Sequence, residues 1–379
     1  MQIWEHVTRP YFIPMKLLSN IQILFLTRIV RLFGYGLLSI ILVIYLAERG
    51  LSEAQIGILL SLTLIGDVIM SLWITQHADR FGRKRTLVLS SLLIVWAGVL
   101  FLITSSFPLL LLAAIIGVIS PSGNEVGPFL AIEQAALSQT TPDHSRTRIF
   151  AWYHLCGFFA TALGSLFAGF MMRFPLQHDA SSLESYQRIL FFYAMIGMLL
   201  GALFMLLSSK IETPVNTSLE ARPKYLGLHR SRSKVLKLSG LFAVDAFGGG
   251  FILQSILAYW FYIRFHVNPV VLGSVFFGMN ALAGLSGLLA ARLASRIGLI
   301  NTMVFTHLPS NFLLMLVPLM PSLPWAISVL LLRSIISQMD VPTRQSYTMA
   351  VVEPDERSAA AGIANIARTL GASVSPVLA

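Results

Sequence analysis

Charged residues are scarce in this sequence. Only 12% of its 379 residues are Asp, Glu, Lys or Arg, whereas 56% are hydrophobic. A typical soluble protein carries about 25% charged residues, and so small a share does not cover the surface of a water-soluble chain of this length. The composition argues against a soluble enzyme, a fibrous repeat or a disordered chain. It predicts a protein embedded in a lipid bilayer.

Several chemical motifs are also absent. Cys156 is the only cysteine, which excludes an intrachain disulfide, and the sequence has neither a CxxC motif nor a Cys/His cluster for a metal. It has no Gly-Lys-Ser/Thr loop to hold the phosphates of ATP. The net charge of +10 comes from basic residues clustered between apolar runs, not from a basic face suited to nucleic acid. We therefore expect no metal, no cofactor and no nucleic-acid partner.

Long apolar runs recur along the whole chain. A helix needs about 20 apolar residues to cross about 30 Å of hydrocarbon, and runs of this kind predict an all-α membrane fold. The one long polar connection, 210–235, separates a six-helix bundle over 1–209 from a five-helix bundle over 236–379. The eleven predicted spans are 21–47, 54–76, 86–105, 108–138, 147–172, 187–209, 236–263, 269–292, 301–320, 323–350 and 358–379.

Basic residues are distributed unequally between the two sides of these spans. The N-terminal tail, the central connection and alternate loops carry most of the Lys and Arg, whereas the other side carries only Arg49, Arg173, Arg188 and Arg264. Loops rich in Lys and Arg stay in the cytoplasm during insertion. We therefore expect a cytoplasmic N-terminus and a location in the plasma membrane.

The two bundles share an internal repeat. Phe-Gly-Tyr-Gly at 33–36 recurs as Phe-Gly-Gly-Gly at 247–250, and Gly57 and Gly82 recur as Gly273 and Gly298 at nearly the same spacing. Such agreement predicts two copies of a six-helix unit. Duplicated bundles of this kind are typical of transporters whose site lies near the membrane midplane, between the copies.

The loop between the second and third predicted helices reads Ala-Asp-Arg-Phe-Gly-Arg-Lys over 78–84. This stretch resembles the signature loop of the major facilitator superfamily, G-x-L-A-D-R-x-G-R-K, although Thr75 and His77 depart from it. The resemblance implies secondary active transport by alternating access and a twelve-helix fold, so that the chain is expected to lack the last helix. It assigns a gating role to Asp79, Arg80, Gly82, Arg83 and Lys84.

Ionisable residues also occur inside the apolar runs. A charge in the bilayer interior costs several kcal/mol, so each is expected to face the bundle interior or a water-filled cavity and to find a partner. The arginines are Arg28, Arg31, Arg333, Arg344 and Arg368, and the acids are Asp67, Glu125, Glu133, Asp245 and Asp340.

Arg28 and Arg31 lie on one face of the first helix, where they attract either a carboxylate from another helix or an anionic substrate group. In the fourth helix, prolines and glycines around Asn124 and Glu125 interrupt the backbone hydrogen bonds near the midplane. Glu125 and Glu133 are therefore candidates for a substrate or proton site, and a structural pair with an arginine is the alternative.

The second bundle offers further candidates. Asp340 and Arg344, at i and i+4, are expected to pair along their own helix, and a pair between Arg344 and Glu133 is the alternative. Asp245, in the seventh predicted helix, occupies the position equivalent to Arg31 in the first. It is expected either to pair with Arg31 and hold these two helices together or to be a coupling site. Arg368 completes the set, whereas His307 is more typical of a packing hydrogen bond.

Together these observations predict a monomeric secondary transporter that moves a small-molecule substrate. The resemblance to the superfamily implies coupling to H+, which the intramembrane acids support, and the overall size and short loops resemble those of its small efflux members, which implies outward transport. Uptake by the same fold is one alternative, and an inactive fragment is another. A membrane enzyme using Glu125, Glu133 and His307 is a third, although no HExxH or GxSxG motif accompanies these residues.

Overall fold

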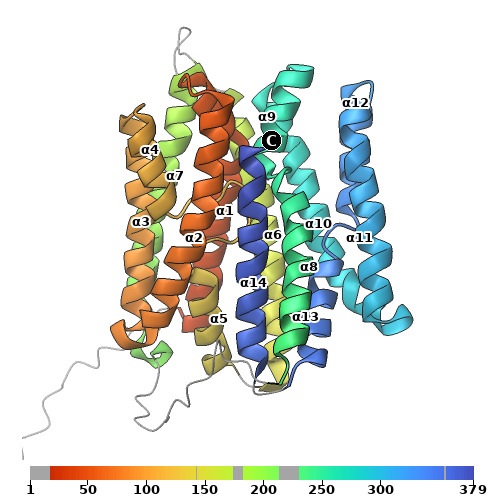
Figure 1. Ribbon diagram of the computed structural model, residues 1–379. Helices are drawn as coiled ribbons and strands as arrows, with labels where there is room; N and C mark the ends of the chain where they lie inside the picture. The colour runs from red at the N-terminus through yellow and green to blue at the C-terminus, as the bar shows by residue number, and fades with distance from the viewer. Residues whose placement is uncertain (1–17, 142, 174–181, 213–229, 354–355) are drawn as a thin grey trace, which may run out of the picture.

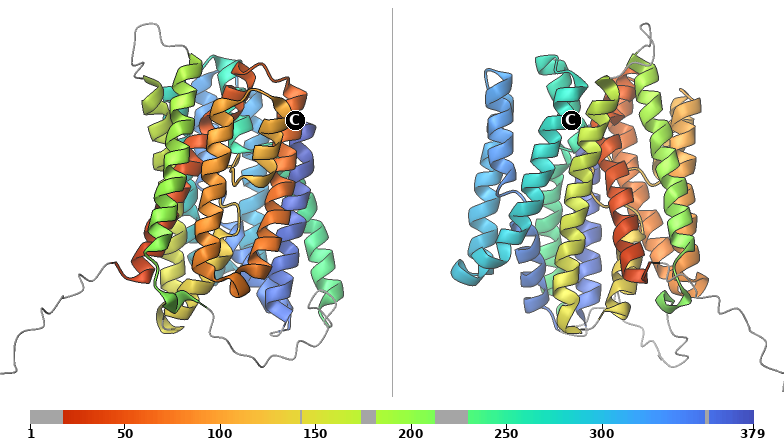
Figure 2. Two further views of the ribbon diagram at one scale, coloured as in Figure 1. Left: turned by 90° about the vertical axis from the view of Figure 1, so that its left-hand side faces the viewer. Right: turned by 180° about the vertical axis from the view of Figure 1, so that it is seen from behind.

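The computed structural model describes residues 18–141, 143–173, 182–212, 230–353 and 356–379. These residues form an array of long helices that run roughly parallel to one another, as Figures 1 and 2 show. We call the end of the array that holds the start of the first helix the Asn20 face, and the opposite end the Glu48 face. The all-α prediction is confirmed.

The first half of the chain contains seven α-helices in its described part. Ser19 and Ser52 begin the first two helices with capping boxes, in which the serine and a glutamine three residues later bond each other's backbone. The helices are α1 (Asn20–Glu48), α2 (Glu53–Phe81), α3 (Arg83–Ile103), α4 (Phe107–Ile116), α5 (Phe129–Thr140), α6 (Asp143–Arg173) and α7 (Ser182–Met205), followed by the short η1 (Ser209–Ile211).

The second half repeats this plan. Its described helices are α8 (Arg232–Gly250), α9 (Gln254–Phe265), α10 (Pro269–Ile297), α11 (Leu299–Leu316), α12 (Leu323–Ser334), α13 (Asp340–Val351) and α14 (Arg357–Val374), with the short η3 (Val317–Leu319) and η5 (Ser375–Val377). Gly82 separates α2 from α3 at φ 94°, and Gly298 separates α10 from α11 at φ 86°. Both turns use the left-handed conformation that glycine allows.

Close helix contacts also recur in the two halves. Gly36 of α1 lies so near Thr161 of α6 that a Cβ would overlap the Thr161 backbone, and Gly250 of α8 stands in the same relation to Ala372 of α14. The reciprocal contacts join Gly164 to Phe33 and Gly371 to Ala243. The repeat seen in the sequence is therefore a repeat of helix packing.

Three helices predicted as continuous are interrupted. The span 108–138 consists of α4 and α5, with a non-helical stretch over 117–128 between them. The spans 236–263 and 323–350 are likewise divided, into α8 with α9 and into α12 with α13. In the first case Pro121 and Pro128 cannot donate backbone hydrogen bonds, and Gly123 and Gly127 adopt positive φ, so the helix does not continue.

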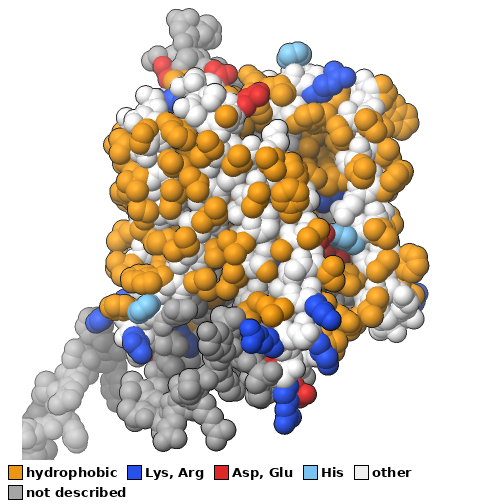
Figure 3. Space-filling model, viewed as in Figure 1, with side chains coloured by type: hydrophobic (Ala, Val, Ile, Leu, Met, Phe, Trp, Pro, Cys, Tyr) orange, Lys and Arg blue, Asp and Glu red, His pale blue; other side chains and the backbone are white. Residues whose placement is uncertain are grey.

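The membrane character follows from length and hydropathy. Eight helical segments of the described chain are long and apolar enough to cross a bilayer, and α4 and α12 are shorter apolar helices. Figure 3 shows hydrophobic side chains over most of the visible surface, with most basic side chains gathered at the Asn20 face. This is an integral membrane protein, whereas the count of eleven spans stays a prediction.

Candidate functional site

A cavity of about 1430 Å³ lies between the two halves. Its walls come from α1, α2, α5 and α6 on one side and from α8, α9 and α11 to α14 on the other. Figure 3 shows acidic, basic and histidine side chains in a recess of the otherwise apolar surface. The ionisable residues that line the cavity are Arg28, Asp67, Glu125, His154, Asp245, His307, Arg333, Asp340, Arg344 and Arg368.

Behind the first wall lies a fully buried ion pair. Arg31 donates from Nη1 and Nη2 to the two carboxylate oxygens of Glu133, at 2.8 and 2.6 Å, and neither side chain is exposed to solvent. Thr27 donates to the same carboxylate at 2.9 Å, and the Tyr153 hydroxyl also donates to it. The guanidinium of Arg31 lies over the Phe129 ring, 4.6 Å from its centroid. Glu133 is thus a fully buried acid whose carboxylate accepts hydrogen bonds from Thr27, Arg31 and Tyr153.

Glu125 extends this network to the cavity. Arg28 Nη1 and Arg31 Nε donate to its two oxygens at 2.7 and 2.8 Å. The non-helical stretch between α4 and α5 positions this carboxylate, because it turns the chain toward α1 at that depth. The carboxylates of Glu125 and Glu133 therefore lie beside Arg28 and Arg31, while a substrate or proton role for these residues stays a prediction.

Asp67 of α2 is the other acid of the first wall. One of its carboxylate oxygens accepts hydrogen bonds from the Gly127 backbone N–H and from the Ser71 hydroxyl. Among the described residues no arginine or lysine forms an ion pair with it. Asp67 thus has polar neighbours but no direct counter-charge.

The second wall carries a cluster centred on a histidine. His307 Nε2 lies 2.7 Å from Asp245 Oδ1, and Nδ1 lies 3.4 Å from Asp340 Oδ2. Arg344 Nη1 lies 3.1 Å from the same Asp340 oxygen and 3.6 Å from Asp245 Oδ2. The pair predicted along the helix, Asp340 with Arg344, is present. Asp245 pairs with His307 and Arg344 rather than with Arg31, which Glu125 and Glu133 occupy.

Two further arginines of this wall stand alone. Arg333 of α12 and Arg368 of α14 line the cavity. Within the described chain the side chain of neither forms an ion pair or a hydrogen bond, and the Nε atom of each is shielded from solvent without a partner. The expectation that every intramembrane charge pairs with another is therefore wrong for these two residues and for Asp67. In the second wall, Arg344 and His307 already contact the carboxylates of Asp245 and Asp340.

Neutral polar groups join the two halves beside the cavity. Gln254, at the start of α9, donates to Ser39 Oγ of α1 at 2.7 Å and to Ser165 Oγ of α6 at 3.3 Å. The Ser255 N–H donates to the Pro121 carbonyl at 3.1 Å, so the start of α9 contacts the interruption between α4 and α5. These hydrogen bonds connect the first half of the chain to the second.

Comparison with known proteins identifies the fold and the family. The profile of the Major Facilitator Superfamily matches residues 24–376. The chain belongs to the major facilitator superfamily. It is 30% identical over 396 residues to the uncharacterized membrane protein YJR124C of Saccharomyces cerevisiae. The aligned region covers 97% of this chain and 88% of that protein.

More distant members of the superfamily also match. The quinolone resistance protein NorA of Staphylococcus aureus is 23% identical over 153 residues, which are 40% of this chain and 38% of NorA. The crystal structure of a D-xylose-proton symporter aligns with a TM-score of 0.70 at 15% identity, over 95% of this chain and 89% of that chain. The second likeness shows a shared fold. Membership in a superfamily of transporters points to transport rather than to an enzyme.

The loop at 78–84 that resembles the superfamily signature forms hydrogen bonds with other segments of the first half. The backbone N–H groups of Arg83 and Lys84 donate to the Glu212 carboxylate at 2.6 and 3.2 Å, at the start of α3. Arg83 also donates from Nη1 to Gln139 of α5 at 2.9 Å, and Lys84 Nζ donates to the Leu207 carbonyl at 2.8 Å. Gly82 supplies the turn, Arg80 is exposed, and the side chain of Asp79 lies outside the described part of the structure.

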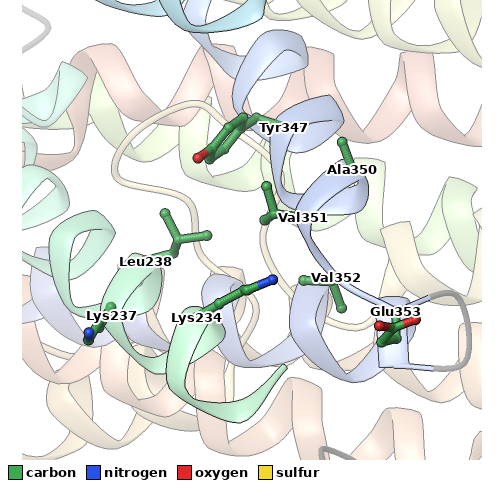
Figure 4. A pocket seen from close by; sticks show the side chains of 8 residues that line it. All are labelled: Lys234, Lys237, Leu238, Tyr347, Ala350, Val351, Val352 and Glu353. Atoms are coloured by element: carbon green, nitrogen blue, oxygen red, sulfur yellow. The ribbon is translucent and has the colours of Figure 1, made fainter. Parts of the chain in front are cut away.

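A second, smaller pocket lies apart from the cavity. It has a volume of about 660 Å³ and is formed between the start of α8 and the end of α13, as Figure 4 shows. Lys234 and Lys237 line it together with Tyr347 and Glu353, and none of its residues lines the large cavity. Its lysines add to the positive charge of the Asn20 face.

The cavity contains most of the residues that the sequence proposed. Arg28, Asn124, Glu125, Asp245, Asp340, Arg344 and Arg368 line it, whereas Arg31 and Glu133 lie behind its wall. Sequence reasoning left Asp67, His307 and Arg333 outside the proposed site, although their charge within apolar runs was the available signal. It also did not find Gln254, whose position at a helix interruption is visible only after folding.

Proposed function

We propose that this protein moves a small solute across the membrane by alternating access of the cavity between its halves, driven by coupled proton movement. The observation that carries the proposal is the cavity itself, which lies between the halves and is lined from both of them by ionisable groups, while neutral hydrogen bonds join the halves beside it. Its volume is ample for a drug-sized or metabolite-sized solute, since ligand sites commonly measure about 300–1,000 Å³.

The neutral hydrogen bonds between the halves suit a reversible gate. Gln254, Ser39 and Ser165 are uncharged, and a neutral hydrogen bond contributes only about 0.5–1.5 kcal/mol net. A transporter must open such a seam in each cycle, and breaking buried ion pairs there would cost far more.

His307 is the proposed coupling group. Its two ring nitrogens face Asp245 and Asp340, so an imidazolium would donate to both carboxylates. Loss of the proton removes one of those donors and changes the charge of the second wall by one unit. Glu125 is less suited to this role, because Arg28 and Arg31 already donate to both of its carboxylate oxygens.

The direction, location and oligomeric state follow the sequence analysis. We infer export from the plasma membrane by a monomer with its N-terminus in the cytoplasm. The name of the matched Staphylococcus aureus protein records resistance to a compound, and removing a compound from the cell is one route to resistance. The halves α1–α7 and α8–α14 would act as the two moving bundles.

The test uses purified protein in proteoliposomes that contain a pH-sensitive dye. A panel of organic anions, organic cations and neutral sugars is added, and proton movement is recorded together with solute counterflow. We expect at least one solute to move protons through the wild type, in a direction set by the imposed gradient. His307→Gln is expected to retain counterflow and lose proton movement.

His266→Asn is the matched control, because His266 is an exposed residue in a left-handed turn that asparagine also adopts. It should behave as the wild type does. Normal proton movement in His307→Gln would remove His307 from coupling. Absence of counterflow for every class of solute would overturn the transport proposal.

A further inference from the structure

The charges of the two walls are balanced differently. In the first wall, Arg28 and Arg31 form ion pairs with Glu125 and Glu133, and Asp67 adds a carboxylate that pairs with no arginine or lysine of the described chain. In the second wall, Arg333, Arg344 and Arg368 share the cavity with only Asp245 and Asp340. The second wall therefore carries an excess of positive charge even while His307 is neutral.

The excess positive charge of the second wall belongs to arginines whose donor atoms lack an acceptor. Arg344 and His307 use the oxygens of Asp245 and Asp340, and this leaves no carboxylate for Arg333 and Arg368. The Nε atoms of these two arginines and the Nη2 atom of Arg344 are shielded from solvent and have no hydrogen-bond partner in the described chain. A buried guanidinium donor without an acceptor is costly, and it gains most from an anionic acceptor.

The two arginines belong to one site although they come from different helices. Arg333 lies near the end of α12 and Arg368 lies in α14, and both line the same cavity. Both share this cavity with Asp340 and Arg344 of α13. A solute in the cavity therefore meets a surface to which both guanidinium groups belong.

We propose that the transported solute is an amphipathic organic anion whose carboxylate or phosphate group binds between Arg333 and Arg368, beside Arg344. The proposal rests on the proposed transport function and names its substrate class. Guanidinium groups suit both oxyanions, because their planar donors match the geometry of carboxylate and phosphate oxygens.

The remaining surface of the cavity matches the rest of such a solute. Phe158, Phe251 and Trp260 provide apolar and aromatic surface, and Gln338 and Asn365 provide amide groups close in sequence to the arginines. A solute with an apolar body and one anionic end thus has complementary surface at both of its ends. An inorganic anion would use the arginines alone.

Binding is tested with probes that share one skeleton and differ in charge. These are 3-phenylpropionate, phenethyl phosphate, the neutral 3-phenylpropionamide and the cation 3-phenylpropylamine, each titrated against purified protein while thermal stabilisation is followed. We expect an anionic probe to bind at least about tenfold more tightly than the amide, since hydrogen bonds to charged groups are the stronger ones. Comparing the carboxylate with the phosphate decides which oxyanion the site prefers.

The variants are Arg333→Gln, Arg368→Gln and the double variant, with Arg292→Gln as the control. Arg292 is an exposed arginine of α10 outside the cavity. Each cavity variant should weaken the anionic probe by at least about tenfold and leave the weak binding of the amide unchanged. Retained amide binding and an unchanged melting profile without ligand show that the variants are folded.

Two outcomes would overturn the anion assignment. One is equal binding of the amide and both anionic probes by the wild type, and the other is undiminished anion binding by the double variant. Counterflow in proteoliposomes separates this failure from failure of the proposed function. Counterflow restricted to cationic or neutral solutes refutes the anion and leaves transport standing, whereas anion binding without counterflow of any solute refutes transport and keeps the anion site.

Discussion

Replacing Arg31 by methionine should strongly destabilise the folded protein. Arg31 makes both of its terminal bonds to Glu133 and a third to Glu125, and neither Arg31 nor Glu133 is exposed. Removing one partner of a buried ion pair costs about 3–5 kcal/mol, because the other charge stays buried without compensation. Glu133 keeps its bonds from Thr27 and Tyr153, so we expect a value near the lower limit.

The assay is thermal unfolding in detergent, arranged as a double-mutant cycle. A loss of about 3 kcal/mol corresponds to a fall in Tm of about 6–12 °C, using the shift expected for 150–250-residue domains. Adding Glu133→Gln to Arg31→Met removes the uncompensated charge, so the double variant should lose less stability than the sum of the two single variants. The methionine still packs on the Phe129 ring, which limits the cost of lost packing.

The reasoning has two points of failure. Arg292→Met, at an exposed position on α10, should change the unfolding free energy by no more than about 0.5 kcal/mol. If Arg31→Met also stays within that limit, the pair makes no net contribution. If the effects of Arg31→Met and Glu133→Gln simply add, the two side chains are not energetically coupled and the described geometry is not the one in solution.

Two further variants test the gate and the helix packing. Gln254→Leu removes the hydrogen bonds to Ser39 and Ser165, so it should favour the state open to the Glu48 side by about 1–3 kcal/mol. To measure this, a single cysteine is placed in the cavity of a Cys156→Ser variant, and it should react faster with a thiol reagent applied from the Glu48 side when Gln254→Leu is present. An unchanged reaction rate contradicts the gate. Gly36→Val should abolish folded protein on size-exclusion chromatography, because its Cβ would overlap the α6 backbone, whereas Gly240→Ala, with open space around it, should gain about 0.5–1 kcal/mol.

The repeat and the local pairs were accessible from the sequence because they depend on spacing along the chain. Gly82 and Gly298 occupy equivalent turns. Asp340 pairs with Arg344 because residues four apart on a helix lie next to each other on its surface. The partner of Asp245 was not accessible in this way. Helical periodicity places a side chain on a face, but the residue opposite depends on how α8 and α11 pack.

The interruptions of the helices show a second limit. Prolines and glycines at 121–128 indicated a disturbed backbone, yet apolar length favoured one continuous span. The deciding factor is tertiary, because the freed backbone groups find partners on other helices. The Pro121 carbonyl accepts from Ser255, and the Gly123 carbonyl accepts from Thr161 at 3.2 Å. A broken helix is stable within a membrane only where other protein groups complete its hydrogen bonds.

The duplicated halves have kept the same packing and acquired different chemistry. In the first half, Arg28 and Arg31 form buried ion pairs with Glu125 and Glu133, so a solute that bound to these arginines would have to displace them. In the second half, Arg333 and Arg368 have no protein partner and His307 is shared between Asp245 and Asp340, so the arrival of an anion or a proton changes the energy of that wall directly. A conformational equilibrium shifts only when a ligand binds its two states with different free energies. We therefore expect solute and proton binding to the second half to shift the conformational equilibrium, whereas the first half provides the opposite wall of the cavity.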